Sequence, residues 1–266
     1  MRFTPAIVVL LCAATAHANP RAFPFTYTTD GLPAGEVEIE QYADLVSMRG
    51  VTSSAAKETY LQSAFQTEIE IGLTDRLELG LYLTYVPTYG DQYGSQTIPA
   101  GAGTGLKQRL KYLLADPDAW PIDVGVYGEL TENESEVELE AKLLLGKRFG
   151  SVRVAANLVG ETELYFSKQR DIVLAPSLAV GYEVTPALHV GIESFLRGEY
   201  PQNPKPATRT FGLGPQAYLG PTVLYNFGKL WWCTGLYTRV TDTSHDLQPG
   251  EPYGRFWART VIGYSL

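Results

Sequence analysis

The sequence predicts an all-β protein that folds as a closed antiparallel up-and-down transmembrane β-barrel of about 12 strands. Three observations predict this fold. Apolar and polar residues alternate with a period of two along most of the chain. Most predicted strands are long enough to cross a bilayer at a tilt, which takes about 9–11 residues, whereas strands of globular proteins average about 5–6. The connections include short turns and much longer loops, as in outer-membrane barrels.

The first 18 residues have the pattern of a secretory signal peptide. Arg2 provides the positive start, residues 6–14 are apolar, and Ala16 and Ala18 are the small residues that a signal peptidase reads. The apolar run is shorter than the roughly 20 residues that a transmembrane helix needs. We expect cleavage between Ala18 and Asn19. Together with the predicted barrel, this export signal places the mature protein in the outer membrane of a Gram-negative bacterium.

Residues 68–85 show the alternation most clearly. Their apolar face carries Ile69, Ile71, Leu73, Leu77, Leu79, Leu81, Leu83 and Tyr85. Their other face carries Glu68, Glu70, Glu78, Gly80, Tyr82 and Thr84. Two strands joined by a tight turn at Thr74-Asp75 would form a hairpin with one face for lipid and one for a polar interior.

The same alternation predicts a barrel domain over residues 36–266. Its twelve strands are expected at residues 36–46, 60–73, 76–87, 104–114, 122–131, 135–149, 151–164, 170–184, 187–199, 213–227, 229–241 and 255–266. The connections after every second strand are short, and the others include long loops at residues 47–59, 88–103, 200–212 and 242–254. Connections 132–134 and 165–169 are short exceptions on the long-loop side. We expect the long loops to be extracellular.

Residues 19–35 do not alternate and are rich in aromatic residues and proline. This segment would either extend into the periplasm as a tail or fold into the lumen as a small plug. At the other end, residues 256–266 alternate up to Leu266. A last strand of this kind is typical of barrels that the outer-membrane assembly machinery recognises, so this machinery and the outer-membrane lipids are expected partners.

Several short motifs resemble a known family. They are FPFTYT at 23–28, LPAGEVE at 32–38, Glu40-Gln41, GLTDRLELG at 72–80, KQRLKY at 107–112 and Leu219-Gly220-Pro221 before a Trp-rich strand. The sequence resembles uncharacterised proteobacterial outer-membrane β-barrels related to the transporters named for the meta-pathway of phenol degradation. The resemblance covers most of the mature chain and rests on turns and strand edges. It implies a barrel with a transport role.

Charged side chains recur on the inward period of the predicted strands. A cation at the middle of the bilayer would cost about 2–4 kcal/mol, so charges this numerous must face a lumen. The predicted lumen-lining residues are Glu36, Glu38, Glu40, Glu68, Glu70, Glu78, Lys107, Arg109, Lys111, Glu129, Glu136, Glu138, Glu140, Lys142, Arg153, His189, Glu193, Arg197, Arg239 and Arg259. They would either pair with one another and stiffen the barrel, or line a pore that selects solutes. Both can hold at once.

Aromatic residues gather near the predicted strand ends, a depth that interfacial aromatics prefer. The predicted interface aromatics are Tyr85, Tyr112, Tyr225, Phe227, Trp231, Trp232, Trp257 and Tyr264.

Other classes of function have little support. The formal net charge of −8 lacks the basic footprint that nucleic acid requires, so no nucleic-acid partner is expected. After processing, only His189 and His245 would remain, without a nucleophile motif, an HExxH or a CxxC pair. We therefore expect no catalytic residue, metal or cofactor, and no enzymatic activity.

The function that the sequence favours is a passive channel or transporter for small-molecule solutes. The alternative is a non-conducting structural or surface-exposed barrel whose extracellular loops bind partners.

Overall fold

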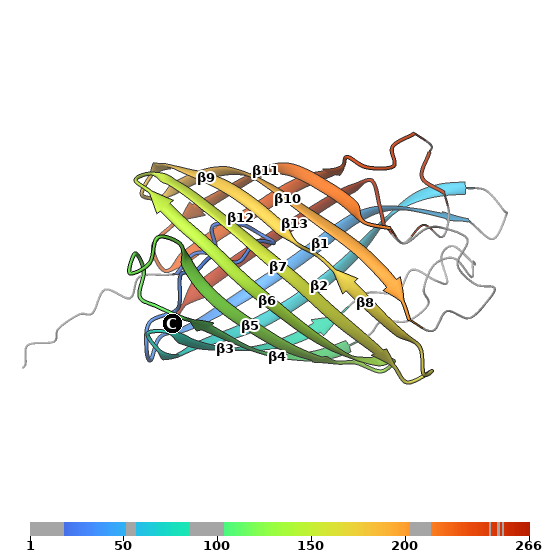
Figure 1. Ribbon diagram of the computed structural model, residues 1–266. Helices are drawn as coiled ribbons and strands as arrows, with labels where there is room; N and C mark the ends of the chain where they lie inside the picture. Colours follow the sequence, from blue (N-terminus) through green and yellow to red (C-terminus); the bar gives the residue numbers. More distant parts are fainter. Residues whose placement is uncertain are drawn as a thin grey trace, which may run out of the picture.

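The computed structural model describes residues 19–51, 57–85, 104–202, 214–244, 246–248, 251 and 253–266. The strands are β1 (Val37–Val51), β2 (Lys57–Thr74), β3 (Leu77–Tyr85), β4 (Thr104–Leu113), β5 (Asp123–Glu132), β6 (Glu136–Phe149), β7 (Val152–Tyr165), β8 (Arg170–Leu174), β9 (Ser177–Thr185), β10 (Leu188–Pro201), β11 (Gln216–Asn226), β12 (Leu230–Arg239) and β13 (Phe256–Ser265). Each pairs antiparallel with its neighbours, and β13 closes the sheet against β1 (Figure 1).

The barrel has twelve staves, because β8 and β9 together occupy one position between β7 and β10. Pro176 lies between them and has no N–H to give to the ladder. The register does not slip there: Gly160 pairs with Leu174 and Asn157 with Ser177, so the pairing continues past the proline. The predicted closed barrel of about 12 strands is confirmed, and the predicted strand at 170–184 is one stave in two pieces.

The alternation of apolar and polar residues in the sequence matches the alternation of outward and inward side chains in the barrel wall. On β3, Leu81 and Leu83 are exposed on the outside, whereas Glu78 and Tyr82 are buried inside. The outer surface carries exposed apolar side chains from many strands, a surface that suits acyl chains. In the part of the chain that the structure describes, no helix is both long and apolar enough to span a membrane.

The short turns and the C-terminus lie at one end of the barrel, on the left in Figure 1. By the turn-length rule this is the periplasmic end. Two of its turns are tied together by Arg76, whose Nη2 lies 2.7 Å from Asp116 Oδ2 and whose Nε lies 2.8 Å from Asp116 Oδ1. The hydrogen bond and charge of Arg76 lower the pKa of the Asp116 carboxyl below its ordinary value.

Several predicted features lie outside the described residues. These are the signal peptide at 1–18, all of the loop 88–103, most of the loop 200–212, and parts of the loops 47–59 and 242–254, including His245.

Candidate functional site in the barrel lumen

The N-terminal segment, residues 19–35, lies inside the barrel and is drawn in blue ahead of β1 in Figure 1. It forms no strand, so its backbone needs other partners once it is removed from water. Side chains of the wall provide them. Asn157 accepts a bond from Tyr27 N at 2.7 Å and returns one to Tyr27 O at 2.9 Å. Glu193 accepts bonds from the backbone N–H groups of Phe25 and Thr26.

The second half of the segment is attached to β2 and β3. Leu32 N donates to Glu78 Oε2 at 2.9 Å, and Gly35 N donates to Gly72 O at 2.7 Å. Gly72 permits this approach, because a Cβ there would lie 2.0 Å from Pro33 O. The structure thus places residues 19–35 in the lumen and not in a periplasmic tail.

A buried ion network lies beside the segment. Arg109 is only 1 % exposed. Its Nε lies 2.7 Å from Glu68 Oε1, its Nη1 lies 2.6 Å from Glu78 Oε1, and its Nη2 bonds Glu70. Lys111 Nζ lies 3.2 Å from Glu78 Oε2. Arg109 therefore connects carboxylates from both strands of the β2–β3 hairpin.

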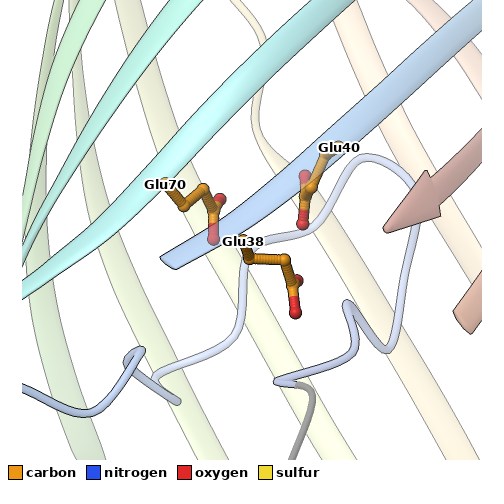
Figure 2. Close-up of side chains that lie close together, drawn as sticks. All are labelled: Glu38, Glu40 and Glu70. Atoms are coloured by element: carbon orange, nitrogen blue, oxygen red, sulfur yellow. The ribbon is translucent and has the colours of Figure 1, made fainter. Parts of the chain in front are cut away.

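The side chains of Glu38, Glu40 and Glu70 lie close together (Figure 2), with one carboxylate oxygen of each within 4.8 Å of the others. Such a spacing suits a cation, and the N-terminal segment supplies one as a side chain. The Arg21 guanidinium lies 3.5 Å from Glu40 and 3.6 Å from Glu70. Glu38 accepts hydrogen bonds from Trp231 Nε1 at 2.9 Å and Ser265 Oγ at 2.6 Å. The cluster therefore acts as an anchor for Arg21.

Carboxylates also form rows across the wall made by β5 to β8. Glu140 lies between Glu129 and Glu161 in the register, and Glu163 lies between Glu138 and Asp171. Like charges directly opposite one another destabilise a sheet unless cations intervene. The cations are Lys107 (3.0 Å from Glu129), Lys142 (2.8 Å from Glu140) and Arg197 (3.5 Å from Glu161). This wall carries more carboxylates than cations.

Two cavities flank the N-terminal segment. The first, which we call the vestibule, has a volume of about 240 Å³ and lies on the extracellular side of the segment. Its lining combines the acidic wall with Phe25, Tyr27 and Trp257. The second, which we call the basin, has a volume of about 470 Å³ and is lined by Asn19, Asp30 and His189 among others, near the periplasmic turns. The segment divides the lumen between them.

All twenty predicted lumen-lining residues lie on the inward register or, for Glu36, just before β1. They form separate groups. Arg259 pairs with Asp44 at 2.8 Å, Arg239 with Glu251 at 3.2 Å, and Arg153 with Asp30. The inward residues that the sequence prediction missed include Arg21, Phe25, Tyr27, Tyr42, Asp44, Tyr82, Tyr127, Asn157, Glu161, Glu163, Asp171, Tyr218 and Tyr237.

Two of the predicted interface aromatics are wrong. Trp231 is fully buried in the barrel interior, and Trp257 points inward, where its Nε1 donates to Asp44 Oδ1 at 2.7 Å. Both share the strand period of a predicted lumen residue, Arg239 and Arg259 respectively. The alternation of the strand therefore indicates that both tryptophans face inward. The preference of aromatic residues for strand ends led to the opposite prediction. The remaining predicted aromatics are exposed on the outside: Tyr85, Tyr112, Tyr225, Phe227, Trp232 and Tyr264.

The neighbouring tryptophans Trp231 and Trp232 give a test of wall orientation. In brominated phospholipid, which quenches indole fluorescence on contact, Trp232→Phe should remove much of the lipid-dependent quenching and Trp231→Phe little of it. Trp231→Phe should instead cost about 1–3 kcal/mol of stability, because a buried oxygen of Glu38 loses its donor. Equal quenching losses in the two variants would contradict the inward placement of Trp231.

Within the described residues, the serine and histidine side chains that could take part in hydrolysis contact other groups and not one another. Ser177 Oγ accepts a bond from Thr26 Oγ1 at 3.0 Å, and Ser194 Oγ donates to Tyr218 O at 2.9 Å. His189 lies opposite Glu183 in the register and lines the basin. Glu193, which the sequence places near His189, bonds the N-terminal segment instead.

A model of a family of unknown function, DUF6662, matches residues 15–242, which is more than half of the chain. The chain belongs to this family. No curated protein matches the sequence. Among solved structures, the barrel is similar to the COG4313 outer membrane channel from Pseudomonas putida F1, with a TM-score of 0.58, 17 % identity, and coverage of 90 % of this chain and 98 % of that one.

Two porins are also similar in fold. The NanC porin has a TM-score of 0.57 and 9 % identity, covering 86 % of this chain and 100 % of that one. The KdgM porin has a TM-score of 0.51 and 9 % identity, covering 86 % and 99 %. At these identities the likeness concerns the fold, which is that of a closed outer-membrane β-barrel.

Proposed function

We propose that this protein is a passive outer-membrane channel for small solutes, with a conduction path through the vestibule and the basin. The observation that carries the proposal is the pair of cavities, about 240 Å³ and 470 Å³, on the two sides of the N-terminal segment. A barrel with only a structural role would need neither. The segment is held by hydrogen bonds and ion pairs and not by a strand, and it narrows the path.

The names of the similar proteins support the same class of function, since they are an outer membrane channel and two porins. The proposal includes export by a signal peptide cleaved before Asn19, insertion by the barrel assembly machinery and contact with outer-membrane lipids. A relation to the transporters named for the meta-pathway of phenol degradation is a further part of it. Its support is the sequence resemblance alone.

The lining of the vestibule carries charges of both signs. The carboxylates of Glu129, Glu138, Glu140 and Glu161 line the cavity together with the cations of Arg21, Lys107, Lys142, Arg197 and Arg259. Loss of one of these charges therefore changes the balance of ions that the cavity attracts. The aromatic residues in the same cavity offer apolar contacts to solutes that combine a charge with an apolar part.

The test is a planar-bilayer recording of the purified full-length mature protein across a salt gradient. We expect discrete conductance, and a reversal potential that moves toward the anion value in Glu138→Gln, because this change removes one carboxylate from the vestibule. Glu138 is chosen because it lines the vestibule, whereas Glu70 pairs with Arg21 and Arg109, and Glu38 accepts hydrogen bonds from Trp231 and Ser265. The matched control is Glu132→Gln. Glu132 follows Thr131, which is the register partner of Glu138, and its side chain lies on the outward face of the same wall.

A reversal potential that is equal in wild type and Glu138→Gln would contradict selectivity by the vestibule. Silence of the protein both with and without residues 19–35 would contradict the channel, and would favour the non-conducting barrel whose loops bind partners.

A further inference from the structure

Within the cluster of Glu38, Glu40 and Glu70, the three carboxylates do not have equivalent partners. The Arg21 guanidinium lies 3.5 Å from Glu40 and 3.6 Å from Glu70, and Glu70 also bonds Arg109. In the described part of the chain, no lysine or arginine forms an ion pair with Glu38. Glu38 is thus the member of the cluster that lacks a cation.

Glu38 lies at the start of β1 and is fully buried. Two of its hydrogen bonds come from neutral side chains, Trp231 Nε1 at 2.9 Å and Ser265 Oγ at 2.6 Å. A buried carboxylate is costly unless a cation pairs with it, and hydrogen bonds from neutral groups offset only part of that cost. The surroundings of Glu38 therefore favour a further, positively charged donor.

A backbone group of the N-terminal segment already occupies the place of this donor, because Glu38 accepts a hydrogen bond from the N–H of Asn19. In the full-length precursor this nitrogen belongs to a neutral amide with one hydrogen. Cleavage of the signal peptide before Asn19 would turn the same nitrogen into an ammonium group, which has three N–H donors and is mostly charged at about pH 7. Cleavage would thus create a cation beside the carboxylate that lacks one.

We propose that Glu38 is the binding site for the α-ammonium group of mature Asn19, and that this ion pair fixes the start of the N-terminal segment in the lumen. The inference rests on that part of the proposed function which places signal-peptide cleavage before Asn19. It gives the free N-terminus a role of its own, because only a chain that begins at this residue presents a cation to Glu38.

The residues that follow Asn19 support this placement. Pro20 restricts Asn19 to extended conformations, so the ammonium group has few directions open to it. Arg21 contacts the other two carboxylates of the cluster, and its guanidinium lies 4.0 Å from the centre of the Tyr27 ring. Two cations that are two residues apart in the chain would therefore meet three carboxylates.

Binding of Asn19 would also turn the N-terminal segment into a closed loop. The end of the segment is attached beside the start of β1, where Gly35 N donates to Gly72 O at 2.7 Å. Glu38 lies three residues after Gly35, so the two ends of the segment meet at the same place. A loop that is fixed at both ends has less conformational freedom than a tail that is fixed at one, and it keeps the vestibule and the basin apart more firmly.

The test measures the reactivity of the N-terminal amine in full-length mature protein purified from outer membranes. Cyanate is the probe, because it is small and Asn19 lines the basin, a cavity of about 470 Å³. At about pH 7 it carbamylates α-amines in preference to lysine, since the reactive form is the neutral amine. An ammonium group held by a carboxylate lacks the electron pair that attacks cyanate. Mass spectrometry of the N-terminal peptide identifies the first residue and then follows its carbamylation.

We expect a chain that begins at Asn19, whose amine reacts at least about tenfold more slowly in the folded protein than in guanidinium chloride. Glu38→Gln keeps the size of the side chain and removes its charge, so most of the lost rate should return. The matched control is Glu163→Gln, which removes a buried lumen carboxylate at the other end of the barrel, near the end of β7. The control should react as slowly as wild type.

A second variant keeps every side chain of the barrel, and so tests the site even if Glu38→Gln does not fold. One glycine inserted between residues 18 and 19 moves the ammonium group by up to about 3.8 Å, the distance between consecutive Cα atoms. Its amine should react nearly as fast as that of the unfolded chain. The heat-modifiable band on unboiled gels shows that each variant is folded.

The inference is overturned if Asn19 of the folded wild type reacts as fast as in the unfolded chain. It is also overturned if folded Glu38→Gln or the glycine insertion keeps full protection, or if Glu163→Gln loses protection equally. A mature chain that begins at another residue overturns it together with the expected cleavage site.

Planar-bilayer recording of the same protein tests the channel separately. A protein that conducts while its amine is unprotected would keep the channel and lose this site. A protein that is silent while its amine is protected would keep the site and lose the channel.

Discussion

Deletion of residues 19–35 is expected to raise the single-channel conductance several-fold. The segment separates a vestibule of about 240 Å³ from a basin of about 470 Å³, and its removal would join them into one bore. The barrel wall keeps all its inter-strand pairings in this variant, because the segment takes part in none of the strands. Planar-bilayer recording of the variant, with the signal peptide fused ahead of Glu36, gives the measurement.

A milder variant distinguishes a plug from a structural support. Asn157→Ala removes the two bonds to Tyr27 while the rest of the segment remains attached. We expect brief openings toward the conductance of the deletion variant. The deletion also exposes carboxylates that Arg21 contacts, so its cation preference should increase. Conductance that is identical in wild type and both variants would show that the segment does not limit flow.

Replacement of Arg109 by alanine is expected to destabilise the barrel by about 3–5 kcal/mol, the range for removing one partner of a buried ion pair. Glu68, Glu70 and Glu78 are all nearly inaccessible to water, and each would lose the guanidinium that it contacts. The readout is the urea midpoint of the refolded protein, together with the heat-modifiable band on unboiled gels.

The matched control is Arg76→Ala. Its partner Asp116 is exposed in a periplasmic turn, and such surface pairs contribute only about 0.2–1 kcal/mol. Acid of about pH 4 should restore part of the stability of Arg109→Ala, because Glu68, Glu70 and Glu78 no longer repel one another once they are protonated. Urea midpoints that agree between the two variants would contradict the central role of Arg109.

Much of this barrel follows from local patterns in the chain. The period of two assigns a face to each residue of a strand, so the alternation alone is enough to place Leu81 outside and Glu78 inside. The same reasoning predicts the strands from β1 to β13 within a few residues, and it places all twenty charged or histidine candidates on the inner side or next to it. It does not mark Pro176 as an interruption, because the effect of a proline depends on whether its missing N–H would have bonded a neighbouring strand.

The sequence prediction fails where a residue is assigned by its place near the end of a strand and not by the alternation of inward and outward residues. Trp231 and Trp257 are predicted to lie at the membrane interface because they are near the ends of predicted strands. Their partners, Glu38 and Asp44 on β1, are distant in sequence and reach them only after β13 closes the barrel. A large ring with one N–H donor is favourable in the lumen when an acceptor is there, and the sequence does not show the acceptor.

The all-β class, the strand positions and the two faces of the wall can be derived from the sequence, because these features depend on residues one or two positions apart. The folded barrel was needed to show where residues 19–35 lie, which carboxylates Arg109 and Arg21 connect, and that Trp257 lines the vestibule. The physical reason is that a segment without a repeating pattern takes its place from its partners. Asn157, Glu193 and Glu78 come from three different staves, and only closure of the barrel brings them to the same interior.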